Sequence, residues 1–457
     1  MASLLIKNGR VLSSADHLDG ELDLLIEDGV IRQIGPGLAA RADETMEARG
    51  QVVAPGFLDL HCHLREPGGE ISETIETGLA AAVAGGFTSV CAMPNTRPGN
   101  DNPSATRTLI EKARKLGLAR VFPMAAVSLG SQGETLTDFA SLVEAGAVGF
   151  TDDGRPVKTA GLMEQALQRA RGIDVPIADH CEDSTLHPGG VMNEGPVSNR
   201  LGFRGIPNSS EEVCVARDLG LAAETGGHLH VQHLSTAGAM EMVRAAKRRG
   251  VRVTCEVTPH HFTLTDEAMA KYGANAKMNP PLRSVRDVEA VIAGIVDGTV
   301  DAIATDHAPH AVELKRKPMA DAPFGITGFE TALALALTRL VHPGNISLAQ
   351  LVVLMSTHPA RLIHQSLAAQ SGSVAPGFSP ADAALKGGAA SKASPSLGRL
   401  TIGGTADVTI FDPHLEWTYR AAEGRSKSLN SPFDGWQFKG AVIATIVAGK
   451  IVYRRAA

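Results

Sequence analysis

The chain has 457 residues, and its 43 basic and 49 acidic side chains give a net charge of -6 at neutral pH. Because the two signs are mixed, there is no basic stripe for nucleic acid and no polybasic patch for a membrane, so we expect a small-molecule partner. The length fits an α/β barrel of roughly 250 residues plus a smaller domain.

The five cysteines are scattered and form no CxxC pair. This pattern argues against a disulfide framework and against a cysteine zinc site. The apolar stretch at the start of the chain is too short for a signal peptide, and no run of 18 apolar residues occurs. We therefore expect a cytoplasmic protein without a membrane segment.

The two ends of the chain have similar patterns. Residues 1–51 contain short apolar runs with Asn8-Gly9 and Asp28-Gly29, which we interpret as turns, and residues 399–457 contain strand-like runs at 407–411 and 441–447. We expect both ends to pair into one small β-sandwich domain. Residues 366–398, rich in Ala, Gly and Ser, are predicted to be a mobile insertion.

Residues 52–365 alternate short apolar or β-branched runs with longer segments of helical period, which is the pattern of βα units around a parallel sheet. Eight such units predict a closed (β/α)8 TIM-type barrel. The expected strands are 52–60, 88–93, 120–127, 147–151, 175–179, 228–232, 251–257 and 300–305.

Polar residues follow seven of the eight expected strands, at the rim where barrel enzymes carry out chemistry. They are His61 and His63, Asn95, Asp152 and Asp153, His180, His233, His260 and His261, and Asp306, His307 and His310. Nothing beyond this enrichment singles out nine histidines, which we interpret as loop or structural residues: His187, His228, His230, His260, His261, His342, His358, His364 and His414.

His61 and His63 are separated by one residue, so in an extended segment both imidazoles point to the same side while Cys62 turns away. Two converging imidazoles are good ligands for zinc or a similar metal. Together with Asp306, which follows a distant strand, they indicate a metallohydrolase.

At this point the motifs resemble those of the dihydroorotases of the amidohydrolase superfamily, and more narrowly the long bacterial class I type. The resemblance implies a barrel of the metal-dependent hydrolase kind. It covers nearly the whole chain outside the insertion and is carried by residues 55–68, 93–96, 150–154, 180–183, 233–236, 258–261, 278–283, 305–310, 322–326 and 431–435.

The resemblance implies one or two zinc ions. It assigns His61, His63 and Asp306 to one site and His180 and His233 to a second. Many relatives bridge the metals with a carbamylated lysine, whereas the class I type uses the second Asp of a Thr-Asp-Asp-Gly run, here Asp153. We expect Asp152 to be structural.

The implied reaction is the reversible cyclisation of N-carbamoyl-L-aspartate to L-dihydroorotate in de novo pyrimidine biosynthesis. Asp306 is the expected catalytic residue, relaying a proton between water and the ring nitrogen. The resemblance assigns the substrate carboxylate to Arg65, Asn95 and His310, and the ring amides to Asn279 and the backbone of Phe324 and Gly325.

Alternatives stay open at this stage. One is a dihydropyrimidinase-like or allantoinase-like hydrolase, and another is an inactive homologue that serves as a structural partner of aspartate transcarbamoylase. A complex with that enzyme alongside activity, and a homo-oligomer, are also compatible with the sequence. Residues 311–323 are either a loop that closes over the site or a solvated basic loop.

Overall fold

The computed structural model describes residues 3–363 and 396–456. Most of the predicted insertion at 366–398 therefore lies outside the described residues, as does His364. The division of the chain into domains at residues 51, 365 and 398 stays a prediction.

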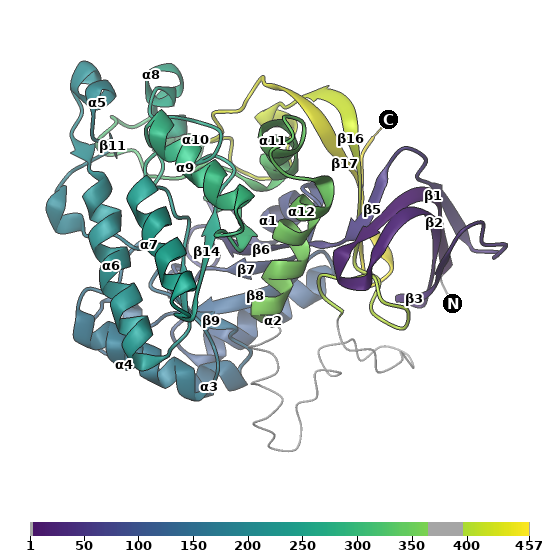
Figure 1. Cartoon of the computed structure of the whole chain (residues 1–457), viewed down its shortest axis with the longest axis horizontal. Coiled ribbons are helices and arrows are strands. Elements are labelled where there is room, and N and C mark those ends of the chain that lie inside the picture. Colours follow the sequence, from purple (N-terminus) through teal and green to yellow (C-terminus); the bar gives the residue numbers. More distant parts are fainter. Residues whose placement is uncertain (1–2, 364–395, 457) are drawn as a thin grey trace.

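A parallel sheet of eight strands forms the barrel predicted from the sequence, and helices surround it (Figure 1). The strands follow the spatial order β15, β14, β13, β10, β9, β8, β7, β6. Their bounds are β6 (Phe57–Cys62), β7 (Phe87–Ala92), β8 (Arg120–Ala125), β9 (Gly149–Phe150), β10 (Ile177–Asp179), β13 (Leu229–Val231), β14 (Val253–Val257) and β15 (Ala302–Ile303).

The chain beyond β15 brings the last strand back to the first. Cys62 and His307 form a parallel bridge, and the backbone N–H of His63 donates to the carbonyl of His307 at 2.9 Å. The Asp59 carboxylate also accepts from the N–H and the hydroxyl of Thr305, both at 2.7 Å. These contacts join the segment that carries His61 and His63 to the segment that carries Asp306.

The helices cover the outside of the barrel, and their ends follow local sequence signals. In α2, Asn102 accepts from the N–H groups of Ser104 and Ala105, Pro103 is the first helical residue, and Gly117 ends the helix with φ 65°. The α-helices are α1 (Ile75–Ala84), α2 (Pro103–Leu116), α3 (Phe139–Glu144), α4 (Ala160–Gly172), α5 (Pro196–Leu201), α6 (Asn208–Thr225), α7 (Ala237–Arg248), α8 (Ala268–Tyr272), α9 (Val285–Val296), α10 (Val312–Lys315), α11 (Ala332–Ala336) and α12 (Leu348–Val352).

Shorter elements complete the barrel and its loops. Two strands, β11 (Met192–Asn193) and β12 (Gly205–Ile206), pair in a loop. The 3-10 turns are η1 (Ser14–Asp16), η2 (Leu129–Ser131), η3 (Ser184–Leu186), η4 (Gly273–Ala276), η5 (Phe329–Thr331) and η8 (Ala421–Glu423), and the π turns are η6 (Leu337–Val341) and η7 (Val353–Thr357).

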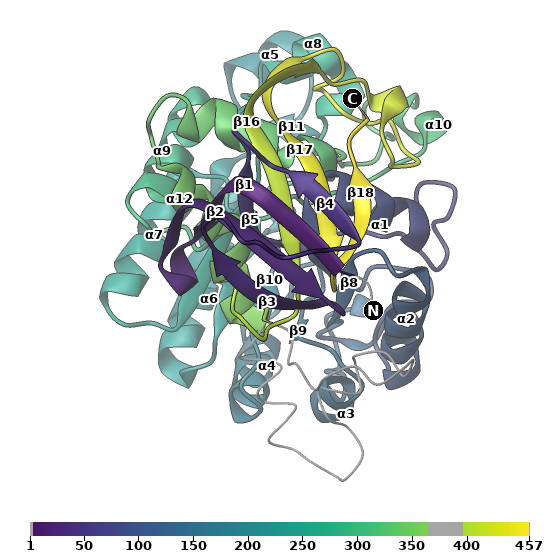
Figure 2. The same cartoon turned by 90° about the vertical axis from the view of Figure 1, so that its right-hand side faces the viewer.

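Both chain ends contribute to one mainly antiparallel sheet beside the barrel, where the first strands lie alongside the last (Figure 2). Apolar side chains from both ends share one core. Its strands are β1 (Ser3–Ser13), β2 (Leu18–Glu27), β3 (Val30–Gly35), β4 (Glu44–Glu47), β5 (Val52–Pro55), β16 (Val408–Thr418), β17 (Gln437–Val447) and β18 (Lys450–Arg454).

Two local predictions are wrong. The expected strand 52–60 is two strands, because β5 pairs with β1 and β16 in the terminal sheet whereas β6 belongs to the barrel. Gly56 separates them, and a Cβ there would lie 2.2 Å from the Thr88 hydroxyl oxygen. Asn8 and Gly9 do not form a turn but an irregularity inside β1, with Asn8 at φ 59°.

The predicted turn at Asp28 and Gly29 is confirmed. Both residues have positive φ, 50° and 79°, as a tight hairpin between β2 and β3 requires. All five cysteines are buried and free, as their spacing predicted. Among the described residues, no helix has the length and apolar character needed to cross a bilayer.

Candidate metal centre

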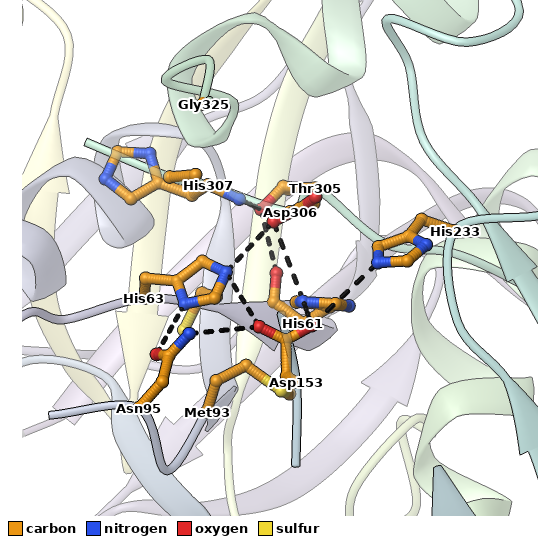
Figure 3. Close-up of polar contacts among 12 residues, drawn as sticks. His61, His63, Met93, Asn95, Asp153, His233, Thr305, Asp306, His307 and Gly325 are labelled. Atoms are coloured by element: carbon orange, nitrogen blue, oxygen red, sulfur yellow. Dashed lines mark hydrogen bonds and ion pairs between the residues drawn. The ribbon is translucent and has the colours of Figure 1, made fainter. Parts of the chain in front are cut away.

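The six predicted metal ligands converge at one end of the barrel, and Figure 3 labels five of them. His61 lies on β6, and the others lie just beyond the ends of their strands. Each of the six residues is at most 5% exposed. The residues that follow β6, β9, β10, β13 and β15 are thus brought together as the sequence predicted: His61, His63, Asp153, His180, His233 and Asp306.

Asp153 lies between two groups of histidines. Its Oδ1 is 3.3 Å from Nε2 of His61, and it is 3.7 Å from Nδ1 of His180 and 3.8 Å from Nε2 of His233. Its Oδ2 is 3.5 Å from Nε2 of His63. One carboxylate therefore faces both predicted ligand groups, which is the arrangement that a bridging ligand needs.

Asp306 closes the first group. Its Oδ1 is 3.1 Å from Nε2 of His63 and 3.6 Å from Nε2 of His61. Burial alone would raise the pKa of Asp306, but the two histidines lower it below the ordinary range. The carboxylate is therefore ionised at neutral pH.

The tautomer of His61 tests whether these residues fit a cation. Its Nδ1 lies 2.7 Å from Oε1 of Glu256, and a carboxylate can only accept, so Nδ1 carries the hydrogen. Nε2 then presents a lone pair to Asp153 and Asp306, and it has no hydrogen-bond partner among the described residues. A lone pair facing two buried carboxylates is stable only with a positive charge between them, so the donor set fits a divalent metal.

The electrostatics point the same way. Burial opposes charge on His61, yet the carboxylates of Asp306 and Asp153 raise its pKa well above the ordinary value. Burial would raise the pKa of Asp153, but His61 and the hydrogen bonds from His180 and His233 lower it well below the ordinary value. The site thus attracts positive charge despite being buried.

Three residues of the site adopt left-handed backbone conformations that residues other than glycine rarely occupy. Arg65 has φ 59°, Asp306 has φ 43° and His233 has φ 31°. Such conformations persist only where the surrounding structure imposes them, and they concentrate at functional sites.

Two of the predicted substrate residues contact predicted metal ligands in this structure. Oδ1 of Asn95 is 2.9 Å from Nδ1 of His63, and its Nδ2 donates to Oδ2 of Asp153 at 3.1 Å. Nδ2 of Asn279 is 3.2 Å from Nε2 of His180. Both amides therefore help to orient ligands, a role that the sequence analysis did not assign to them.

The other predicted substrate residues lie together at the side of the cluster. Nη2 of Arg65 is 3.2 Å from Nε2 of His310. Nε2 of His310 is also 2.7 Å from the carbonyl oxygen of Phe324. Gly325 has φ 150°, and a Cβ there would approach the carbonyl oxygen of Ala308 to 2.5 Å. A cavity of about 350 Å³ opens beside His310.

Asp152, which is buried next to Asp153, makes contacts consistent with the structural role that we expect for it. Its carboxylate accepts from the N–H of Ser128 at 3.1 Å and also from the Ser128 hydroxyl. It thereby ties the segment after β9 to the segment after β8.

Residues 311–323 are anchored by two lysines. Nζ of Lys277 donates to the carbonyls of Met319 and Ala322, both at 2.6 Å. Nζ of Lys315, which is buried, donates to Ala274 at 2.8 Å and Pro323 at 2.9 Å. Lys315 is therefore not a solvated side chain, whereas Arg316 and Lys317 are exposed.

A second cluster of potential ligands needs no metal. The thiols of Cys181 and Cys214 donate to the carboxylates of Asp218 and Asp179, both at 3.6 Å. Nε of Arg217 donates to Asp218 at 2.7 Å. Since Arg217 offsets one of the two carboxylates and both thiols already have carboxylate acceptors, we assign the cluster to packing around α6.

Comparisons with known proteins agree with this geometry. A family model described as "Dihydro-orotase-like" matches residues 50–239. A protein named dihydroorotase from Pelobacter propionicus is 47% identical over 99% of this chain and 100% of its own length. Another from Syntrophus aciditrophicus is 46% identical over 99% of both chains.

Solved structures share the fold over the whole chain. An L-hydantoinase (dihydropyrimidinase) from Arthrobacter aurescens has a TM-score of 0.83 at 26% identity and covers 100% of this chain and 97% of its own. A dihydropyrimidinase from Brevibacillus agri has a TM-score of 0.80 at 24% identity, which shows the fold alone. Because these dihydroorotases are 46–47% identical to the chain over nearly their full length, the chain belongs to the dihydroorotase family within the amidohydrolase superfamily.

Proposed function

We propose that the protein is a metal-dependent dihydroorotase of the class I type, which interconverts N-carbamoyl-L-aspartate and L-dihydroorotate in de novo pyrimidine biosynthesis. The observation that carries this proposal is the 47% identity to a dihydroorotase over essentially both full chains. The carboxylate of Asp153 between the two histidine groups supports the class I assignment.

The proposed cofactor is zinc, as one or two ions. His61, His63 and Asp306 would hold one ion, His180 and His233 the other, and Asp153 would bridge them. When bound, zinc supplies a Lewis acid that polarises the amide carbonyl and makes hydroxide available at neutral pH. The imidazole and carboxylate donors suit zinc, while the number of ions is open to measurement.

Asp306 is the proposed proton carrier. Because it is ionised at neutral pH, its carboxylate can take a proton from the attacking water and deliver it to the departing ring nitrogen. In the biosynthetic direction the same oxygen takes the proton from the ureido nitrogen as the ring closes and delivers it to the departing oxygen, which leaves as water.

Arg65 is the proposed main contact for the substrate carboxylate, with Asn95 and His310 beside it. Its pKa is lowered to about 10 by burial, so the guanidinium stays charged in a site with little water, where an ion pair is strong. Burial and the nearby Arg65 lower the pKa of His310 to about 2, so His310 is neutral and binds through hydrogen bonds.

Asn279 and the backbone of Phe324 and Gly325 are proposed to bind the ring amides. In the present structure the Phe324 carbonyl accepts from His310, so substrate would have to compete for this group. The neighbouring Lys277 and Lys315 fix the segment that ends at Phe324, which keeps the carbonyl near the site.

The rival functions are less well supported. Dihydropyrimidinase-like enzymes take uncharged rings, which would leave the partly buried guanidinium of Arg65 without a carboxylate partner from the substrate. An inactive partner of aspartate transcarbamoylase would not need the complete set of six ligands. The proposal also includes location in the cytoplasm, a homo-oligomer and a complex with aspartate transcarbamoylase. Localisation in cells tests the first of these, and measurements of mass in solution test the other two.

Substrate selectivity tests the proposal. We expect zinc-loaded protein to hydrolyse dihydroorotate with a kcat/KM at least 100-fold above that for dihydrouracil, which lacks the carboxylate. A preference for dihydrouracil or for allantoin would contradict the assignment.

A further inference from the structure

A chain of hydrogen bonds runs from the metal centre into the barrel. Oε1 of Glu256 is 2.7 Å from Nδ1 of His61, and its Oε2 is 3.2 Å from Nε2 of His230. Nδ1 of His230 is 2.9 Å from the hydroxyl of Thr254, and Nε2 of His228 is 2.9 Å from the same hydroxyl. His61 is one of the six predicted ligands, whereas Glu256, His230, Thr254 and His228 are not.

The alternation of β13 and β14 places this chain inside the barrel. Their apolar residues Leu229, Val231, Val253, Cys255 and Val257 all pack in one hydrophobic core. The polar residues between them point to the opposite face. Glu256 is fully buried, and an ionised carboxylate at such depth is costly unless its hydrogen bonds are complete.

The direction of two hydrogen bonds in the chain follows from that carboxylate. A carboxylate can only accept, so Nδ1 of His61 and Nε2 of His230 both donate to Glu256. The Thr254 hydroxyl then lies within hydrogen-bond distance of both His230 and His228.

We propose that Glu256 and His230 are positioning residues of the metal centre, which hold His61 in the one tautomer whose Nε2 lone pair faces the metal. This inference rests on the proposed metal-dependent function and extends it to two residues on β13 and β14. His230 acts by keeping Glu256 in place and by occupying its second oxygen. From the sequence alone His230 is interpreted as structural, because the sequence does not show that Glu256 is its hydrogen-bond partner.

Replacing Glu256 with Gln breaks the arrangement without changing side-chain size. An amide offers one acceptor and one donor, so either His61 or His230 must face an N–H group. Where the new amide N–H faces Nδ1 of His61, the imidazole hydrogen moves to Nε2. Nε2 then has no lone pair with which to bind metal. Loss of such a partner to a ligating histidine typically lowers metal affinity by about 10- to 100-fold.

The test compares zinc affinity in three full-length proteins after metal removal, using competition with a chelator of known affinity. We expect Glu256→Gln to lower zinc affinity by about 10- to 100-fold. The matched control is His228→Gln, at the far end of the same buried chain. It leaves the bonds of Glu256 intact, so its affinity should stay within about 3-fold of the parent, well below the loss expected for a direct partner.

Two results would overturn the inference. One is a parental zinc affinity in Glu256→Gln, and the other is an equal loss in His228→Gln, which would indicate general packing damage. The outcome is separate from the proposed function. Parent protein that binds zinc but does not turn over dihydroorotate contradicts only the function.

A second measurement does not depend on any variant. The nitrogen chemical shifts of His61 in the zinc-loaded parent, obtained by 15N NMR with His61→Gln for assignment, report which ring nitrogen carries the hydrogen. We expect the Nδ1–H form. The Nε2–H form would contradict the inference even if Glu256→Gln failed to fold.

Discussion

At the scale of single residues, the neighbours Asp152 and Asp153 show how one step along the chain separates structure from chemistry. Both are buried, yet one carboxylate binds Ser128 while the other faces four histidines. Successive residues point in different directions, so the pair offers a matched test.

Asp153→Asn should lower bound metal and reduce kcat/KM by at least about 100-fold, because an amide nitrogen replaces one of the oxygens shared by the two ligand groups. Asp152→Asn should keep its metal and instead lower stability by about 1–3 kcal/mol, through weaker bonds to Ser128. Metal analysis, initial rates and thermal unfolding of both variants check this. Metal loss in Asp152→Asn alone would reverse the assignment.

Arg65→Gln should raise KM for dihydroorotate by about 10- to 100-fold, since hydrogen bonds to a charged group contribute about 1.5–3 kcal/mol. Any slow hydrolysis of dihydrouracil should change little. Arg32→Gln removes the same charge from an exposed pair with Glu27 in the terminal sheet and serves as the control. Equal loss with both substrates would show that Arg65 only supports the fold.

At the scale of elements, the buried His228 directly precedes β13, the buried His230 lies within it, and the predicted metal ligand His233 follows it. Burial lowers the pKa of His228 to about 3, whereas the unfolded chain titrates near 6.5. Between these values the unfolded state binds one more proton than the folded state. His228 therefore destabilises the fold as pH falls through this window, by at most about 1.4 kcal/mol per pH unit.

His228→Gln removes this contribution. Between pH 7 and pH 5, the melting temperature of the metal-free variant should fall less than that of the metal-free parent. Thermal unfolding at both pH values measures the difference. Parallel losses in the two proteins would mean that His228 is protonated, or exposed, in the folded state.

At the scale of the whole molecule, local patterns in the sequence predicted the barrel and the pairing of the chain ends, and the family resemblance predicted which six side chains converge. Strand-end histidines must meet once eight strands close. By contrast, the contact between His61 and Glu256 depends on which side chains of β6 and β14 meet across the barrel. The spacing of the sequence does not specify this.

Other features were not predicted from the sequence, also for physical reasons. One apolar run forms both β5 of the terminal sheet and β6 of the barrel. The chain passes from one sheet to the other at Gly56, which Thr88 approaches closely, and the apolar pattern does not reveal this point. Lys277 and Lys315 are buried because their partners are backbone carbonyls, which leave no trace in the side-chain pattern.

Metal removal should lower the stability of the entire chain, because Asp153 and Asp306 then lack the charge that compensates them. Zinc at about 100 times its Kd would stabilise the folded state by about 2.7 kcal/mol. We expect the melting temperature to rise by several degrees with zinc and much less with magnesium, which prefers oxygen ligands. An equal response to both metals would point to nonspecific binding.

The most direct measurement is the initial rate of dihydroorotate hydrolysis and of N-carbamoyl-L-aspartate cyclisation by purified protein, with bound metal quantified in the same sample. We predict turnover in both directions that is abolished by chelation and by Asp306→Ala. No turnover in metal-replete protein, in either direction, would contradict the assignment of this chain as an active dihydroorotase.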